Sequence, residues 1–168
     1  MRHLAVATCI LFLQALAVAG QQPSEPEAVY RQYLAAFKTI HSLDDRSLDV
    51  YLSKTAQKKM AEARLHPEKK TCGLCPSPEQ EVRMMKAMRP YPGPEVRPVR
   101  TESGGIVTLT YKWHEAPGSD KGFSVTGSDV SVKAELVHEE GWKLKSESWV
   151  FVENPGTATA RGTTVWSY

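Results

Sequence analysis

Residues 106–114 read Ile-Val-Thr-Leu-Thr-Tyr-Lys-Trp-His, and this stretch decides the fold class of the chain. Apolar and polar side chains alternate through it, which is typical of a β-strand with one buried face. The buried face is expected to carry Val107, Leu109, Tyr111 and Trp113. The pair Gly104-Gly105 just before the stretch predicts a turn from an earlier strand.

The two-residue period continues through the second half of the chain. It predicts a strand at 96–101, which Pro98 limits to the sheet edge, and a strand from 123 to 136 that bends near Gly127. A last strand is predicted over 142–152. Its apolar residues fall into two registers, with Trp142, Leu144, Val150 and Val152 in one and Trp149 and Phe151 in the other. The second half is therefore predicted to form a curved antiparallel sheet.

The first half has helical periodicity instead. An S-x-x-E pattern at 24–27 predicts a helix start, and one face of that helix carries Tyr30, Tyr33, Leu34, Phe37, Ile40 and His41. A short helix is predicted around 48–52. Two more are predicted, one from Lys54 to about Leu65 with Ser53 as its cap, and one that starts at Ser77 and ends before Pro90. Helices followed by an antiparallel sheet indicate an α+β domain.

The N-terminal 19 residues are predicted to be a cleavable signal peptide. Met1-Arg2-His3 is basic, and the apolar core that follows ends on the small-x-small pattern Ala17-Val18-Ala19. The core is shorter than the roughly 20 residues of a membrane span, which disfavours the alternative of an uncleaved anchor. Cys9 lies inside the core and not at the cleavage point, which argues against a lipid anchor. We expect export to the periplasm or the medium, without membrane insertion after cleavage.

Composition limits the partners of the remaining chain. Cleavage after Ala19 leaves about 149 of the 168 residues, with one domain at 20–152 and a predicted flexible tail at 153–168. The 21 Lys and Arg residues nearly balance the 19 Asp and Glu residues. A nearly neutral protein has no strong electrostatic attraction to nucleic acid or membrane surfaces. No nucleic-acid motif, phosphate loop or cofactor motif is evident.

The run Val29 to Phe37, a short second helix and the closing Gly141-Trp142-Lys143-Leu144 strand resemble the nuclear-transport-factor-2-like superfamily. The resemblance extends from Glu27 to Val152. Within the superfamily, the chain is most similar to exported members of unknown function. It implies a cystatin-like cone, in which N-terminal helices pack in a strongly curved antiparallel sheet, often around a pocket. Homodimers also occur in such a superfamily, so a homodimer is among the expected partners.

The resemblance also bears on catalysis. Tyr33 matches the helix tyrosine that supplies an oxyanion-hole hydrogen bond in isomerase-like members. Those members place an aspartate base on a strand after the second helix, and here that segment is Ala56-Gln57-Lys58-Lys59-Met60. The acid–base pair is therefore incomplete.

A set of aromatic and imidazole side chains could line a pocket in the cone. Core packing accounts for most of them, since aromatic residues dominate any core. The ligand-pocket candidates are Tyr30, Tyr33, Phe37, His41, Tyr111, Trp113 and Trp149. His41 either points into the cone or stabilises the helix end, and His114 could pair with Asp120 near the rim.

Cys72-Gly73-Leu74-Cys75 is the one motif with built-in chemistry. Two cysteines remain after cleavage, and in an oxidising compartment we expect them to form a disulfide. A redox centre is the alternative, because Lys69 and Lys70 could lower a thiol pKa. No metal is expected, since two cysteines fall short of a four-ligand zinc site.

These observations favour an exported non-enzymatic domain that binds a small apolar ligand or an exported protein partner in a cone-shaped pocket. One alternative is a cofactor-free isomerase or dehydratase that uses Tyr33 with His41 or His114. Another is an exported interaction module that neutralises or scaffolds a second protein through its sheet.

Overall fold

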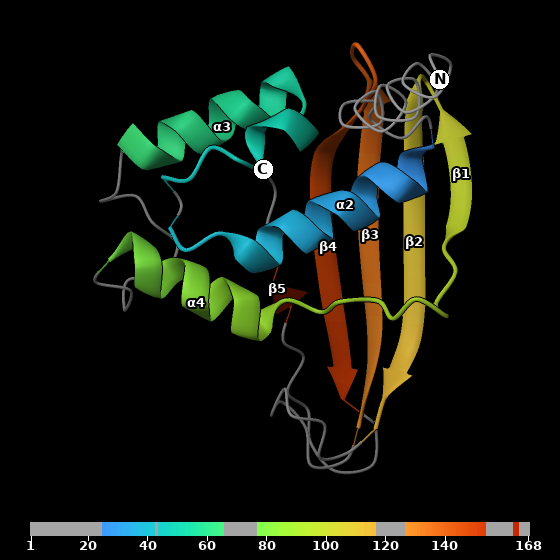
Figure 1. Cartoon of the computed structure of the whole chain (residues 1–168). Helices are drawn as coiled ribbons and strands as arrows, with labels where there is room; N and C mark the ends of the chain where they lie inside the picture. Colours follow the sequence, from blue (N-terminus) through green and yellow to red (C-terminus); the bar gives the residue numbers. More distant parts are fainter. Residues whose placement is uncertain (1–24, 43, 66–76, 117–126, 154–162, 165–168) are drawn as a thin grey trace, which may run out of the picture.

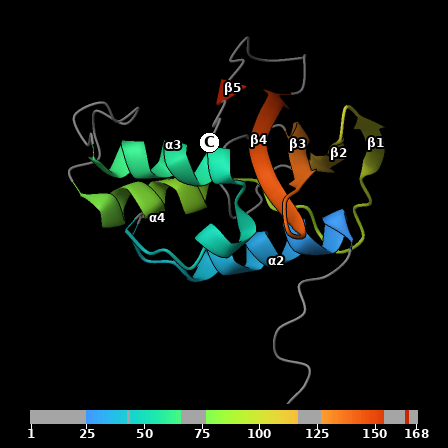
Figure 2. The same ribbon diagram turned by 90° about the horizontal axis from the view of Figure 1, so that it is seen from above.

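An antiparallel sheet, with one helix across one of its faces and two helices beside it, is the framework of the protein (Figures 1 and 2). The structure is a computed structural model that describes residues 25–42, 44–65, 77–116, 127–153 and 163–164. Helices come first in the chain and strands second, which confirms the α+β class. None of the helices in these ranges combines the length and apolar composition that a bilayer span requires.

In the described ranges, three α-helices and one 3-10 turn precede the strands. They are α2 (Pro26–Thr39), η1 (Asp49–Tyr51), α3 (Lys54–Leu65) and α4 (Pro78–Met88). The helix predicted at 54–65 is confirmed, as is the role of Ser53, whose hydroxyl accepts a hydrogen bond from the Ala56 amide at 3.2 Å. Ser77 caps α4 in the same way, through the Gln80 amide at 3.3 Å.

The first helix differs from its prediction at both ends. Glu25, which makes no side-chain capping bond, is the N-cap, and Ser24 lies outside the described residues. The helix ends at Thr39 because Ile40 is already extended, with ψ at 149°. His41 therefore lies beyond the helix and is exposed, so its predicted place on the apolar stripe is wrong.

The sheet is a meander in the order β1-β2-β3-β4-β5, and every neighbouring pair is antiparallel. Its strands are β1 (Val99–Ser103), β2 (Ile106–Glu115), β3 (Ser128–His138), β4 (Trp142–Glu153) and β5 (Thr163–Thr164). The first strand lies at the edge as predicted but begins at Val99, not at residue 96. Val96 is instead in a turn, where its amide donates to the Gly93 carbonyl at 3.1 Å.

A glycine is required at the start of β3. Gly127 has φ of 88°, and a Cβ there would lie 2.9 Å from the Glu115 carbonyl oxygen. Strand β3 begins directly after it, at Ser128. The part of the predicted strand before Gly127, residues 123–126, lies outside the described residues, so the predicted bend stays a prediction.

Helix α2 crosses one face of the sheet, and α3 and α4 lie beyond its β4 edge (Figure 1). We call the face under α2 the covered face and the opposite one the open face. The covered face holds the buried strand residues Val107, Leu109, Tyr111, Val130, Val132, Ala134, Leu136, Leu144 and Trp149. In the described part of the chain no element lies over the open face (Figure 2).

Side-chain bonds to backbone carbonyls tie the remaining segments to α2. Arg31 donates to the carbonyls of Val96 at 2.9 Å and Gly93 at 3.4 Å, which fixes the connector between α4 and β1. Lys86 of α4 donates to the carbonyls of Lys38 (2.8 Å) and Ile40 at the C-terminal end of α2, where positive charge is favourable.

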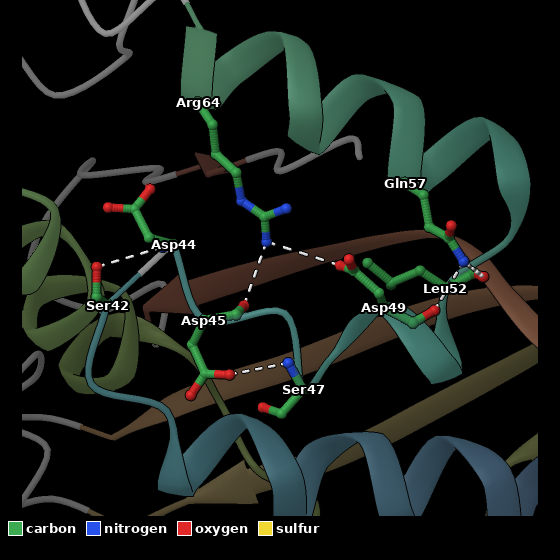
Figure 3. Close-up of polar contacts among 8 residues, drawn as sticks. All are labelled: Ser42, Asp44, Asp45, Ser47, Asp49, Leu52, Gln57 and Arg64. Atoms are coloured by element: carbon green, nitrogen blue, oxygen red, sulfur yellow. Dashed lines mark hydrogen bonds and ion pairs between the residues drawn. The ribbon is translucent and has the colours of Figure 1, made fainter.

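The loop between α2 and α3 is held from α3 (Figure 3). Arg64 donates to the Asp45 carbonyl at 3.2 Å and pairs with Asp49 at 3.7 Å, while Gln57 donates to the Asp49 carbonyl at 2.8 Å. The Ser47 amide donates to the Asp45 carboxylate, and this bond lowers the pKa of Asp45.

A β-bulge in β4 corrects the predicted registers of the last strand. Leu144 lies opposite Leu136, but Ser146 lies opposite Glu135, so Lys145 is an extra residue without a counterpart in β3. Strict alternation ends there. Trp142 and Leu144 therefore share the covered face with Glu147, Trp149 and Phe151, whereas Val150 and Val152 lie on the open face.

Deletion of Lys145 should destabilise the protein severely. Without the extra residue, either Leu144 or the pair Glu147 and Trp149 would turn to the open face. We expect a loss of about 3 kcal/mol or more in the free energy of unfolding, as for removal of a large core side chain. Urea unfolding followed by circular dichroism measures it. Lys145→Ala keeps the residue count and should stay within about 0.5 kcal/mol of wild type; a deletion variant of wild-type stability would contradict the role of the bulge.

Candidate functional site

A buried ion pair lies at the centre of the protein, between α2, the end of α4 and β4. Arg89 is the C-cap of α4, and its side chain is 1% exposed. Glu147 follows the bulge in β4, and its side chain is fully buried. Arg89 Nη2 donates to Glu147 Oε2, so two charges are removed from water together.

Two phenols from α2 complete the hydrogen bonding of this pair. The Tyr30 hydroxyl donates to Glu147 Oε1, so both carboxylate oxygens have a partner. Arg89 Nη1 donates to the Tyr33 hydroxyl at 3.4 Å. Burial, and then the negative charge of Glu147, raise the pKa of Tyr30, which therefore stays protonated and acts as a donor.

Aromatic rings surround the guanidinium of Arg89. Its Cζ atom lies 4.2 Å from the ring centroid of Phe37, 4.9 Å from that of Tyr33 and 5.8 Å from that of Trp149. All three distances are within the range of cation–π attraction. We call the group formed by Tyr30, Tyr33, Phe37, Glu147 and Trp149 the aromatic cage.

Local sequence places each member of the cage. Tyr30, Tyr33 and Phe37 recur at helical spacing on one face of α2, while Glu147 and Trp149 are two residues apart on the covered face of β4. Pro90 lacks the N–H that would continue α4, so the helix ends and its C-cap, Arg89, reaches the core.

The pair is suited to holding elements together. Its carboxylate accepts bonds from Arg89 and Tyr30, so both oxygens are engaged with other elements of the core. Breaking a buried pair by removing one partner typically costs about 3–5 kcal/mol, because a lone charge stays buried.

The structure brings five of the seven pocket candidates together in the core. Tyr30, Tyr33, Phe37, Tyr111 and Trp149 are at most 1% exposed, and Trp113 is half-buried at the edge of the same cluster. His41 is exposed and does not join them. Their role as ligand contacts stays a prediction.

Tyr111 is the candidate with an unusual hydroxyl. Its ring packs 5.6 Å from that of Tyr30, and the Arg31 guanidinium lies 5.7 Å from its centroid. Its buried hydroxyl has no hydrogen-bond partner among the described residues. Burial, and next the charge of Glu27, raise the pKa of Tyr111 to about 12.

His114 lies on the opposite face of the sheet from Tyr33. Its Nδ1 atom is 2.9 Å from Asp129, the residue across the β2–β3 ladder, and both side chains are exposed. Asp120, the partner expected from the sequence, lies outside the described residues, as do Cys72 and Cys75. Tyr33, His41 and His114 thus do not form one site.

Sequence reasoning missed Arg89 and Glu147. Arg89 precedes Pro90, where the sequence indicates only the end of a helix. Glu147 lies in the gap between the two apolar registers of the last strand. That change of register was itself a signal, because a bulge restores one buried face and carries Glu147 onto it.

Comparisons with protein-family models, curated proteins and solved structures find no match. The resemblance to the nuclear-transport-factor-2-like superfamily, and the cone that it implies, stay predictions. No group of three or more His, Cys, Asp or Glu side chains in the described ranges is arranged to hold a metal ion.

The ion pair can be tested by a double-mutant cycle in urea. Arg89→Met and Glu147→Leu should each lower the free energy of unfolding by about 3–5 kcal/mol, because each leaves a buried charge alone. The double variant should lose less than the sum of the two, since it leaves neither charge. Additive losses would mean that the residues act separately.

Alkaline titration tests the environment of Tyr111. Its pKa of about 12, above the ordinary value of 10, stabilises the fold below pH 10, and this contribution is lost as the pH rises from 10 to 12. Tyrosinate absorbance should contain a component near pH 12 that Tyr111→Phe removes. If the component stays, the hydroxyl is not desolvated as described.

Proposed function

We propose that this chain is an exported non-enzymatic binding domain whose open sheet face binds a second copy of the chain. The observation that carries the proposal is the difference between the two faces of the sheet: α2 covers one face, and no described element covers the other. Under α2, Arg89 and Glu147 bind each other and the phenols of Tyr30 and Tyr33, whereas no described element lies over the open face.

The polar groups under α2 are buried and bonded to one another, which favours a binding protein over an enzyme with its active site there. Glu147 is fully buried, and the phenol of Tyr33 already accepts a bond from Arg89. An acid or base must come within hydrogen-bond reach of a substrate. The isomerase alternative also lacks support from its histidines, since His41 and His114 are exposed away from Tyr33.

The open face has the composition of an adaptable contact surface. Its central rows consist mainly of short hydroxyl side chains, namely Thr101, Thr108, Thr110, Ser131, Ser146 and Ser148. Such side chains hydrogen-bond readily and lose little conformational entropy when they are immobilised. Strands β1 to β4 have 5, 10, 11 and 12 residues. With a rise of about 3.3 Å per residue and a strand spacing of about 4.8 Å, they give a face of roughly 600 Å², which is the lower end of one side of a stable dimer.

The charged residues at the centre of the open face favour a second copy of this chain as the binding partner over a different protein. Lys133 and Glu135 are two residues apart on β3, their charged atoms lie 2.7 Å apart, and Ser146 donates to Glu135 at 2.8 Å. Consider a two-fold axis that lies between the two open faces and crosses β3 at a right angle near residue 134. It would place Lys133 of each chain opposite Glu135 of the other. Symmetric interfaces use one self-complementary patch in this way.

Export remains part of the proposal. It rests on the basic start and the Ala17-Val18-Ala19 cleavage pattern of the first 19 residues, which precede the described ranges.

Charge reversal tests the dimer. Sedimentation velocity on the mature chain should give a dimer, and either Lys133→Glu or Glu135→Lys should convert it to a monomer, because each creates two like-charge contacts across the axis. The double variant, Lys133→Glu with Glu135→Lys, restores opposite charges and should dimerise again.

Lys58→Glu is the matched control, since Lys58 is an exposed lysine on α3. It should leave the dimer intact. A wild-type chain that stays monomeric at high concentration, or a dimer that ignores both single reversals, would refute the proposal.

A further inference from the structure

Strand β1 forms one edge of the sheet, and all 5 of its residues are exposed (Figure 1). An edge strand carries a row of backbone N–H and C=O groups that can pair with a further strand. In the described part of the chain no segment bonds to the outer side of β1. This edge is therefore able to accept one more strand.

The turn between β1 and β2 determines which backbone groups of β1 point outward. The glycine pair at 104–105 has φ of 57° and 75°, which is typical of a two-residue hairpin turn. In such a turn the carbonyl of Ser103 accepts a hydrogen bond from the Ile106 amide. Hydrogen-bonded and non-hydrogen-bonded pairs alternate along an antiparallel ladder. The N–H and C=O groups of Arg100 and Glu102 therefore point away from β2.

We propose that the outer edge of β1 pairs with the same edge of a second copy of the chain, antiparallel and centred on Thr101. In this register Arg100 of each chain lies opposite Glu102 of the other, and both pairs are of the hydrogen-bonded kind. Thr101 lies opposite Thr101 of the second copy, and such threonine pairs stabilise sheets. The inference goes beyond the proposed open-face dimer, because it uses the edge of the sheet and a different pair of charges.

The charges of β1 select both the partner and the register. Arg100 and Glu102 lie on the same face of the strand, with their charged atoms 3.7 Å apart and their side chains 47% and 61% exposed. Opposite charges that face each other across two strands are favourable, and like charges are unfavourable. Pairing centred on residue 100 would set arginine against arginine, and pairing centred on residue 102 would set glutamate against glutamate. Only the register centred on Thr101 joins opposite charges twice.

The paired edge is short, so the association is weak. Pro98, which has no N–H, precedes the strand, and the turn at 104–105 follows it. The ladder is thus limited to two hydrogen-bonded pairs with two bonds each, and it buries far less than the roughly 800 Å² per partner of a stable interface. We expect a dissociation constant of roughly 0.3 mM, so the edges stay mostly unpaired at the micromolar concentrations where the open-face dimer is measured.

Amide exchange at the edge tests the pairing in the mature chain. At one millimolar, about two-thirds of the chains would be paired with this affinity. Exchange of the Arg100 and Glu102 amides with water should therefore be about threefold slower than at tens of micromolar. The Thr101 amide, which points toward β2, should not change. Nuclear magnetic resonance on isotope-labelled protein measures all three amides.

Proline substitution on the outer side of β1 gives the most specific variant. Glu102→Pro removes an outward N–H group and leaves the bonds to β2 in place, as an edge strand tolerates. The Arg100 amide should then exchange at the same rate at both concentrations. Glu102→Ala keeps the N–H group and should retain part of the difference.

Charge reversal tests the register. Arg100→Glu and Glu102→Arg should each abolish the concentration dependence, because each sets like charges against one another, and the double variant should restore the threefold change. Arg97→Glu is the matched control, since Arg97 is an exposed arginine just before the strand. It should behave as wild type does. A concentration dependence that survives both single reversals would overturn the proposal.

Lys133→Glu separates the edge from the open face. It reverses a charge at the centre of the open face and leaves β1 unchanged, so the threefold change should persist. Its loss in Lys133→Glu would overturn the edge pairing. A wild type that is monomeric at micromolar concentration would refute only the open-face dimer.

Synthetic peptides of residues 97–105 test the second copy against any other strand. At millimolar concentration the native peptide should slow the Arg100 and Glu102 amides of dilute Lys133→Glu protein. The peptide that carries Arg100→Glu and Glu102→Arg should not, since it sets like charges against the edge. Equal effects of the two peptides would mean that the edge accepts a strand of any sequence, which would overturn self-pairing. Exchange rates that are independent of protein concentration would overturn it as well.

Discussion

The ion pair between Arg89 and Glu147 joins three parts of the chain that are far apart in sequence. Arg89 ends the last helix, Glu147 lies in the fourth strand, and the phenols of Tyr30 and Tyr33 reach both from α2. Because a buried charge without its partner is costly, each element holds the others at one distance and one angle. The remainder of the core packs around that fixed point.

The pair depends in turn on the bulge at Lys145. In a strand of strict alternation, a glutamate at position 147 would lie on the face opposite Leu144. One extra residue reverses that parity, so the carboxylate joins the apolar side chains under α2 and meets Arg89. A local irregularity of the backbone thus decides where the only strand carboxylate shown deep in the described core is placed.

The two faces of the sheet carry different chemistry. The covered face is filled by aromatic rings and a paired charge, which suits stability. The open face presents hydroxyl groups around Lys133 and Glu135, which suits contact with another surface.

Sequence alone determined the α+β class, the span of α3, the caps at Ser53 and Ser77 and the aromatic stripe of α2, because these follow from local periodicity and local hydrogen bonds. Only the tertiary structure decided the features that depend on contacts between distant segments. The register after Lys145, the burial of Glu147 and the entry of Arg89 into the core arise from pairing between distant segments, whose energy is gained only when all of them are folded together.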